Sequence, residues 1–216
     1  MNPYLSELIG RYPLLRECAP DIEQAFSLLR DCYRAGNKLL ICGNGGSAAD
    51  ADHWSAELMK GFLHKRPLKD CGTHSCVPYA KIAESIPSEI AENLQMALPA
   101  IPLTGFTALA TAFANDCDGR FLFAQLVSGL GTPGDVLAAI STSGNSQNIV
   151  HAVRTARAIG LKTIGLTGLP GGCMAGLVDV CIRVPARKVH EIQELHQPVY
   201  HALSMMLEEE FFGDSE

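Results

Sequence analysis

Four residues in two helical segments have side chains that could bind a metal ion or transfer a proton. His53 and Glu57 lie four apart within a predicted helix over 47–62, and this spacing places both on one helix face. Gln193 and His201 lie eight apart near the C-terminus, on roughly one side of a second helix. Imidazoles and carboxylates are common zinc ligands, but glutamine is an uncommon one. A surface pair plus a buried histidine would give the same pattern, so spacing alone does not establish a site.

Two polar loops follow stretches that read as buried strands. Residues 43–47 are Gly-Asn-Gly-Gly-Ser, and residues 141–146 are Ser-Thr-Ser-Gly-Asn-Ser. Glycine lets the backbone approach a ligand closely, and a helix N-terminus offers unpaired N–H groups to an anion. One hydroxyl is enough to cap a helix, so four in the second loop favour phosphate binding. Either loop alone could be an ordinary turn, but two such loops after parallel strands indicate an anion site.

The elements that must position these residues alternate along the chain. Helical periodicity, capping residues and glycine turns predict helices over 20–35, 47–62, 82–98, 147–159 and 187–212. Short apolar runs predict strands over 38–42, 100–104, 135–140, 162–167 and 180–184. Alternating strands and helices predict an α/β fold with a parallel sheet covered on both faces. Ligands on such sheets bind where strands end and loops lead into helices, as both polar loops do.

Composition limits the classes of partner. The formal net charge of −6, from 17 basic and 23 acidic residues, argues against nucleic-acid binding, which needs a basic surface. No apolar run of about 18 residues suggests a membrane span, and residues 1–15 do not read as a signal peptide. The eight cysteines are scattered, and a reducing cytoplasm is the simplest reading.

Three motifs together resemble the sugar isomerase (SIS) domain family, and within it the phosphoheptose isomerase group. They are residues 42–57, residues 140–146 and residues 192–201, and the resemblance spans nearly the whole chain. It implies a single SIS domain over 1–216 with a five-stranded parallel sheet between helices. It also implies a homotetramer in which the N-terminal helices, 1–36, pack in the oligomer while 37–216 form the core.

The resemblance assigns a role to each motif residue. It implies substrate contacts from Asn44, Gly45, Gly46, Asn115, Asp116 and Gln193, and phosphate contacts from Ser47, Ser141, Thr142, Ser143 and Ser146. It implies one Zn²⁺ per subunit, held by His53, Glu57, Gln193 and His201. Glu57 and His201 would also be the catalytic acid–base pair.

The implied reaction is isomerisation of a ketose phosphate to an aldose phosphate through an enediol. The substrate would be sedoheptulose 7-phosphate and the product D-glycero-D-manno-heptose 7-phosphate. Three alternatives remain: another sugar phosphate, a non-catalytic tetramer that binds a replication initiator protein, and a regulatory module that senses a sugar phosphate. The non-catalytic branch lacks equivalents of Glu57 and His201, so their presence favours an enzyme. No segment has room for a DNA-binding domain.

Some features depart from the family or read as ordinary surface. The region 66–108 is longer than in the phosphoheptose isomerases, and Gly61 stands where the family often has arginine, which leaves the exact substrate open. Residues 64–68 are predicted to form a basic surface loop. His196 is predicted to be solvated or to lie at an interface, and the acidic run 208–210 to be a solvated helix face.

Overall fold

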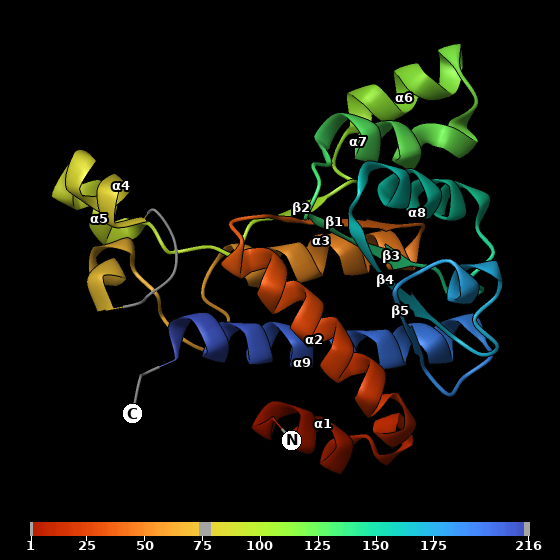
Figure 1. Ribbon diagram of the computed structural model, residues 1–216, viewed down its shortest axis with the longest axis horizontal. Helices are drawn as coiled ribbons and strands as arrows, with labels where there is room; N and C mark the ends of the chain where they lie inside the picture. The colour runs from red at the N-terminus through yellow and green to blue at the C-terminus, as the bar shows by residue number, and fades with distance from the viewer. Residues whose placement is uncertain (1, 74–78, 214–216) are drawn as a thin grey trace.

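The computed structural model describes residues 2–73 and 79–213. A five-stranded sheet forms its centre (Figure 1). The strands are β1 (Leu39–Gly43), β2 (Ala100–Pro102), β3 (Val136–Ile140), β4 (Lys162–Thr167) and β5 (Val180–Arg183). All neighbouring strands run parallel in the order β2-β1-β3-β4-β5. The prediction of a five-stranded parallel sheet is confirmed.

Helices connect the strands and cover both faces of the sheet. They are α1 (Pro3–Arg11), α2 (Ala19–Arg34), α3 (Gly46–Met59), α4 (Tyr79–Ser85), α5 (Ser88–Asn93), α6 (Thr107–Asp116), α7 (Leu122–Leu130), α8 (Gln147–Ile159) and α9 (Val189–Phe212). None of the helices in the described part of the chain has the length and apolar character needed to cross a bilayer.

Alternate strand residues point into two separate cores. In β1, Leu39 and Ile41 face a core that includes side chains of α2, α3 and α9, whereas Leu40 and Cys42 face a core that includes side chains of α7 and α8. This alternation follows from the two-residue repeat of a strand. The result is a three-layer arrangement in which α3 and α9 lie on the same face of the sheet (Figure 1).

Several predicted boundaries differ from the structure. The helix predicted over 47–62 ends at Met59, and the residues after it form a loop bonded to α9. The helix predicted over 82–98 is two short helices, α4 and α5, followed by an extended segment. Two further helices, α6 and α7, lie in a stretch where no helix is predicted. Both are short, and periodic patterns are weakest in short helices.

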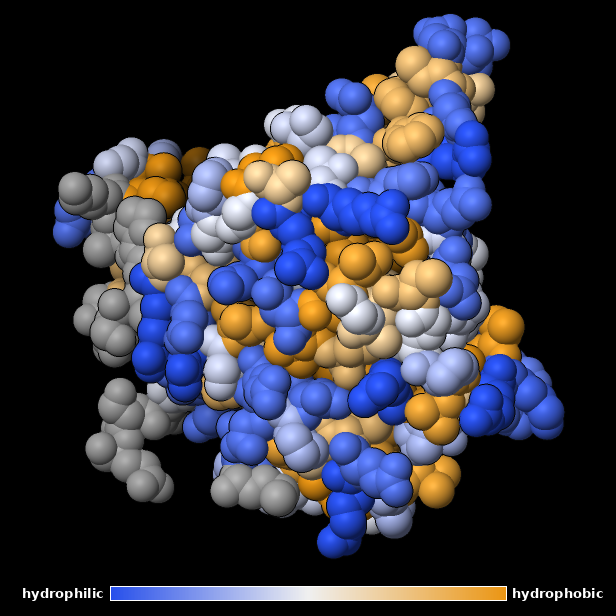
Figure 2. All heavy atoms as spheres, turned by 45° about the vertical axis from the view of Figure 1, so that its right-hand side comes forward, coloured by the Kyte–Doolittle hydropathy of each residue, from blue (hydrophilic) through white to orange (hydrophobic). Residues whose placement is uncertain are grey.

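The helix α6 projects from the body of the molecule (Figure 1). None of its residues is buried, although its sequence, TALATAFAND, is largely apolar. Leu109, for example, is exposed. Figure 2 shows apolar side chains alongside hydrophilic ones on the projecting part of the molecule. An apolar helix without cover in one chain is the kind of surface that a protein contact normally buries.

Candidate active site

The two polar loops form one pocket. Strands β1 and β3 are neighbours, so the loops that follow them meet at the same edge of the sheet. The pocket has a volume of about 310 Å³. It is lined by Asn44, Gly45, Gly46, Ser47, Ile140, Ser141, Thr142, Ser146, Val189 and Gln193. Most of the residues predicted to bind substrate and phosphate therefore lie together.

The glycines of the first loop allow this close approach. Gly45 has a φ of +57°, a conformation that other residues rarely adopt. A Cβ atom on Gly46 would lie 2.4 Å from the side-chain nitrogen of Gln193. The amide of Gln193 therefore packs against the loop backbone, and any side chain at Gly46 would displace it. The predicted role of Gln193 in substrate binding fits this position.

An amide pair ties the first loop to α8. The side chains of Asn44 and Asn148 exchange two hydrogen bonds, of 3.0 and 2.8 Å. In the second loop, Ser141 Oγ donates to Ser146 Oγ over 3.2 Å. Asn148 is not among the predicted site residues. Its position as the second residue of the helix after the serine loop is the feature of the sequence that could have indicated a role there. The Asn44–Asn148 bonds connect the first loop to the helix that follows the second loop.

Three predicted site residues lie outside this pocket. Ser143 is exposed, and its hydroxyl accepts a hydrogen bond from the backbone of Asn145. Asn115 and Asp116 are exposed at the end of α6, where the Asn115 amide donates to the Asp116 carboxylate over 2.8 Å. Within this chain, neither residue of the Asn-Asp pair lines the pocket.

The second cluster joins α3 to α9. Glu57 Oε1 lies 3.3 Å from His53 Nε2 and 3.0 Å from His201 Nε2. One potential ligand atom from each of these three residues lies within 4.8 Å of the other two. Neither oxygen of Glu57 has a hydrogen-bond partner among the described residues, and the same is true of His201 Nε2. Buried polar atoms normally have such partners, so the unpartnered atoms of Glu57 and His201, with His53 beside them, fit a divalent cation.

The environment of Glu57 also suits proton transfer. Its side chain is buried, and burial raises its pKa to about 7, with the nearby charge of Glu208 adding to the effect. For His201 the shift has the opposite sign: burial lowers the pKa of the imidazole, and the nearby His53 lowers it further. A carboxyl group whose pKa lies near neutrality is well matched to the exchange of a proton with carbon.

A hollow beside His201 connects this cluster to solvent. It has a volume of about 390 Å³ and lies between α1, the loop after α3 and α9. Along α9, Val189 and Gln193 face the loop pocket, whereas Gln197, His201 and Met205 face this hollow. These positions are four residues apart and so form one row on the helix. The row leads from the proposed phosphate site to the histidine–carboxylate cluster.

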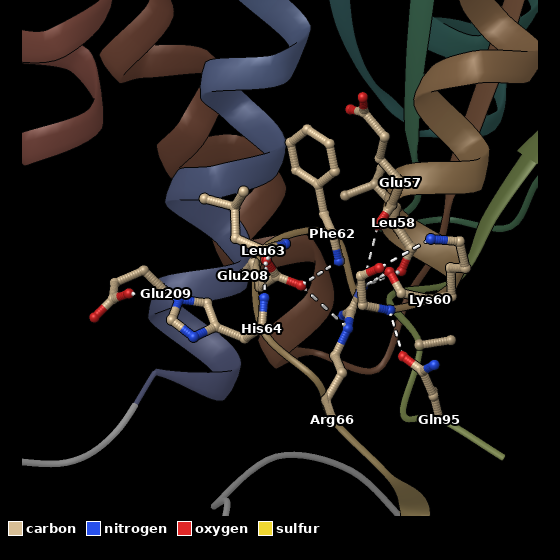
Figure 3. Close-up of polar contacts among 12 residues, drawn as sticks. Glu57, Leu58, Lys60, Phe62, Leu63, His64, Arg66, Gln95, Glu208 and Glu209 are labelled. Carbon is tan, nitrogen blue, oxygen red and sulfur yellow. Dashed lines mark hydrogen bonds and ion pairs between the residues drawn. The ribbon is translucent and has the colours of Figure 1, made fainter. Parts of the chain in front are cut away.

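A buried ion pair lies beyond the cluster and corrects two predictions (Figure 3). Arg66 and Glu208, each 2% exposed, were predicted to be solvated. Arg66 Nε lies 3.5 Å from Glu208 Oε1. The Glu208 carboxylate accepts backbone N–H bonds from residues 62–64, and Arg66 Nη2 donates to the carbonyls of Glu57, Leu58 and Lys60. The pair, called here the clamp, holds the loop after α3 against α9.

His196 corrects a third prediction. It was expected to be solvated or at an interface, but it is fully buried on α9. Burial lowers the pKa of its imidazole to about 4, so the ring is neutral at pH 7. Histidine presents an apolar body when it is uncharged, and the sequence pattern does not distinguish that state from an exposed one.

Comparison with known proteins agrees with this architecture. The sequence matches the SIS domain over residues 12–74 and 71–168. The chain belongs to the SIS domain family. Phosphoheptose isomerase of Akkermansia muciniphila is 36% identical over 217 residues, covering 99% of this chain and all of that protein. Phosphoheptose isomerase of Rhodospirillum rubrum is 40% identical over 195 residues, covering 90% and 88% of the two chains.

A solved SIS structure supports the fold as well. The structure of phosphoheptose isomerase from Neisseria gonorrhoeae superimposes with a TM-score of 0.73 at 33% identity, covering 94% of each chain. The predicted family, its phosphoheptose isomerase group and the three-layer SIS fold are therefore confirmed.

Proposed function

We propose that this chain is an aldose–ketose isomerase that converts sedoheptulose 7-phosphate to D-glycero-D-manno-heptose 7-phosphate. The observation that carries the proposal is the joint placement of two features by α3 and α9. At one end, Ser47 and Gln193 line a pocket of backbone amides and hydroxyls. Further along the same helices, Glu57 lies between two imidazoles. Full-length similarity to phosphoheptose isomerases supports the choice of substrate.

The reaction needs a proton to leave C1 of the ketose and return at C2. Glu57 is the proposed base that removes the C1 proton and delivers it to C2 of the enediol. His201 is the proposed group that donates a proton to the C2 oxygen and recovers one from the C1 oxygen. No net atom is gained or lost. The phosphate in the loop pocket is remote from these carbons, and its binding energy positions them.

The cluster also fits the proposed zinc ion. His53, Glu57 and His201 would hold it, with Gln193 as the predicted fourth ligand; the structure places Gln193 against the glycine loop. When bound, zinc would polarise the carbonyl and orient the two oxygens. Elemental analysis of protein purified without chelators is expected to give one zinc per subunit. Metal-free protein with activity insensitive to EDTA would contradict the assignment.

The remaining proposals concern the assembly and its place in the cell. The uncovered apolar residues of α6 and the exposed pair Asn115-Asp116 support a homotetramer in which other subunits cover this helix. The helices within 1–36 would pack in the same assembly, around a single domain. A cytoplasmic location is consistent with the cysteines, since all those in the described residues are free.

One experiment tests the function directly. The purified protein is incubated with ketose phosphates of five to seven carbons, and NMR detects the aldose product. We expect conversion of the seven-carbon substrate and none with Glu57→Gln. Conversion of only a shorter ketose would change the substrate but keep the reaction. Conversion of none would favour the non-catalytic binding alternative.

A further inference from the structure

A hydrogen-bonded chain lies behind His53, on the side away from Glu57. Tyr200 Oη lies 3.0 Å from His53 Nδ1 and 3.4 Å from Asp50 Oδ1. Asp50 and His53 belong to α3, whereas Tyr200 belongs to α9. Neither Asp50 nor Tyr200 has a role in the function proposed above.

The chemistry of the three groups determines which of them donates each hydrogen bond. An ionised carboxylate can only accept hydrogen bonds, so the Tyr200 hydroxyl donates to Asp50. The phenolic hydroxyl of a tyrosine carries a proton near neutral pH, and this proton is the one donated to Asp50 Oδ1. The Tyr200 oxygen then accepts from His53 Nδ1–H. This selects the tautomer of His53 whose Nε2 carries a lone pair, and Nε2 is the atom 3.3 Å from Glu57 Oε1.

Packing holds the tyrosine in this position. Tyr200 is 1% exposed and Trp54 is fully buried. Their rings stack with centroids 5.9 Å apart and planes inclined by 20°. Burial and stacking therefore restrict the orientation of the Tyr200 ring and of its hydroxyl. A hydrogen bond to the far nitrogen of a metal-binding histidine commonly fixes both its tautomer and its ring orientation.

We infer that Asp50 and Tyr200 are positioning residues that hold His53 with its Nε2 lone pair directed toward Glu57 Oε1 and His201 Nε2, ready for a divalent cation. This inference rests on the proposed metal-binding role of His53, Glu57 and His201. It adds a route by which α9, through Tyr200, orients a ligand on α3.

Zinc affinity of the metal-free protein tests the inference without measuring turnover. Competition with a chromophoric chelator gives the dissociation constant, and the fluorescence of Trp54, the single tryptophan in the sequence, reports binding independently. Tyr200→Phe removes one hydroxyl and is expected to weaken Zn²⁺ binding about tenfold or more. Asp50→Asn is expected to weaken it in the same direction. A Tyr200→Phe affinity within twofold of the unaltered protein would overturn the inference.

Tyr33→Phe is the matched control. Tyr33 is also buried and packs against an aromatic ring, that of Phe211, but its hydroxyl has no hydrogen-bond partner in the described part of the chain. Its removal should leave zinc affinity unchanged. Equal weakening in both variants would assign the effect to general loosening and would also overturn the inference.

A second variant separates this inference from the proposed function. His53→Ala should abolish tight zinc binding. If it does not, the metal site itself is wrongly assigned; if it does while Tyr200→Phe binds normally, only the positioning role fails. Should Tyr200→Phe not fold, ¹⁵N NMR of the unaltered zinc-loaded protein decides. A proton on Nδ1 of His53 supports the inference, and a proton on Nε2 overturns it.

Discussion

Two buried polar clusters follow one another along α9, and they differ in how their charges are paired. In the clamp, Arg66 and Glu208 have opposite charges and both bond to the backbone of the loop after α3 (Figure 3), although Arg66 Nε and Nη1 have no hydrogen-bond partner within the described residues. In the second cluster, Glu57 faces His53 and His201, yet its oxygens accept no hydrogen bond within the described residues.

The clamp is expected to contribute to the stability of the fold, and the Glu57 cluster to its reactivity. A buried charge with an opposite partner and hydrogen bonds holds its neighbours in place, and removing one partner is costly. Burial destabilises the charged form of Glu57 and raises its pKa to about 7, even though the nearby Ser204 hydroxyl lowers it. The clamp bonds directly to the carbonyl of Glu57 itself. The clamp therefore holds the C-terminal end of α3, which carries Glu57.

The largest expected effect is on catalysis. Glu57→Gln should lower kcat by about a thousandfold, because it removes the proposed base. It should leave the free energy of unfolding unchanged or higher, since it removes a poorly solvated carboxylate. Steady-state kinetics and urea unfolding measure the two effects. Glu209→Gln, at the next position after Glu208 on α9 and largely exposed, is the control. Near-normal turnover by Glu57→Gln would reject the base assignment.

The clamp should respond in the opposite way. Glu208→Gln should lower the free energy of unfolding by about 3–5 kcal/mol, because it leaves Arg66 buried without a counter-charge. Glu210→Gln breaks a more exposed ion pair with Arg34 and should cost no more than about 1 kcal/mol. Urea unfolding of both variants makes the comparison. Equal losses would show that the clamp is not a special source of stability.

Two buried groups should change the stability of the fold with pH in opposite directions. The pKa of His196 is about 4 in the folded chain and about 6.5 when unfolded. Between these values the unfolded chain binds the extra proton, so this residue destabilises the fold as pH falls. Glu57 acts in reverse: its folded pKa of about 7 exceeds its ordinary value, so acidification below pH 7 favours the folded state.

Comparing variants isolates the histidine contribution. As pH falls from 6.5 to 5, His196→Asn should gain stability relative to the unaltered protein, by about 1 kcal/mol for each pH unit. Unfolding curves at several pH values measure this difference. A difference independent of pH would mean that His196 is not held neutral by burial.

The smallest expected effect concerns the loop pocket. Ser146→Ala should raise KM about fivefold with little change in kcat, because the hydroxyl lines the pocket and contributes about 1 kcal/mol of binding. Ser143→Ala should also raise KM more than it changes kcat, but by less, since Ser143 lies outside the pocket lining. Initial rates over a range of substrate concentrations measure both. An unchanged KM in both variants would remove the phosphate assignment from the serine loop.

Much of the fold could be predicted from local sequence. The strands over 38–42 and 135–140 are short apolar runs followed by glycine- or serine-rich loops, and parallel pairing then brings the loops together. The convergence of His53 and Glu57 likewise follows from their four-residue spacing. These features depend on neighbours along the chain, which is why a single sequence carries them.

The residues missed by the sequence depend on distant partners. Glu208 bonds to a loop more than 140 positions earlier, and nothing in an acidic run near a C-terminus predicts burial. Tyr200 reaches His53 from another helix, 147 positions away. Charged and polar residues are usually exposed, so a local pattern predicts that such a residue is exposed. That prediction fails where a partner distant in sequence allows the residue to be buried.

The row of residues on α9 has a consequence for which sugars can react. Gln193 and His201 are eight positions apart on one continuous helix, a distance of about 12 Å along its axis. The fixed rise of this helix sets the separation between the loop pocket, which Gln193 lines, and His201. On the proposed function, we therefore expect a ketose phosphate with a shorter carbon backbone to fail to reach from that pocket to His201, so the geometry of α9 would limit substrate length.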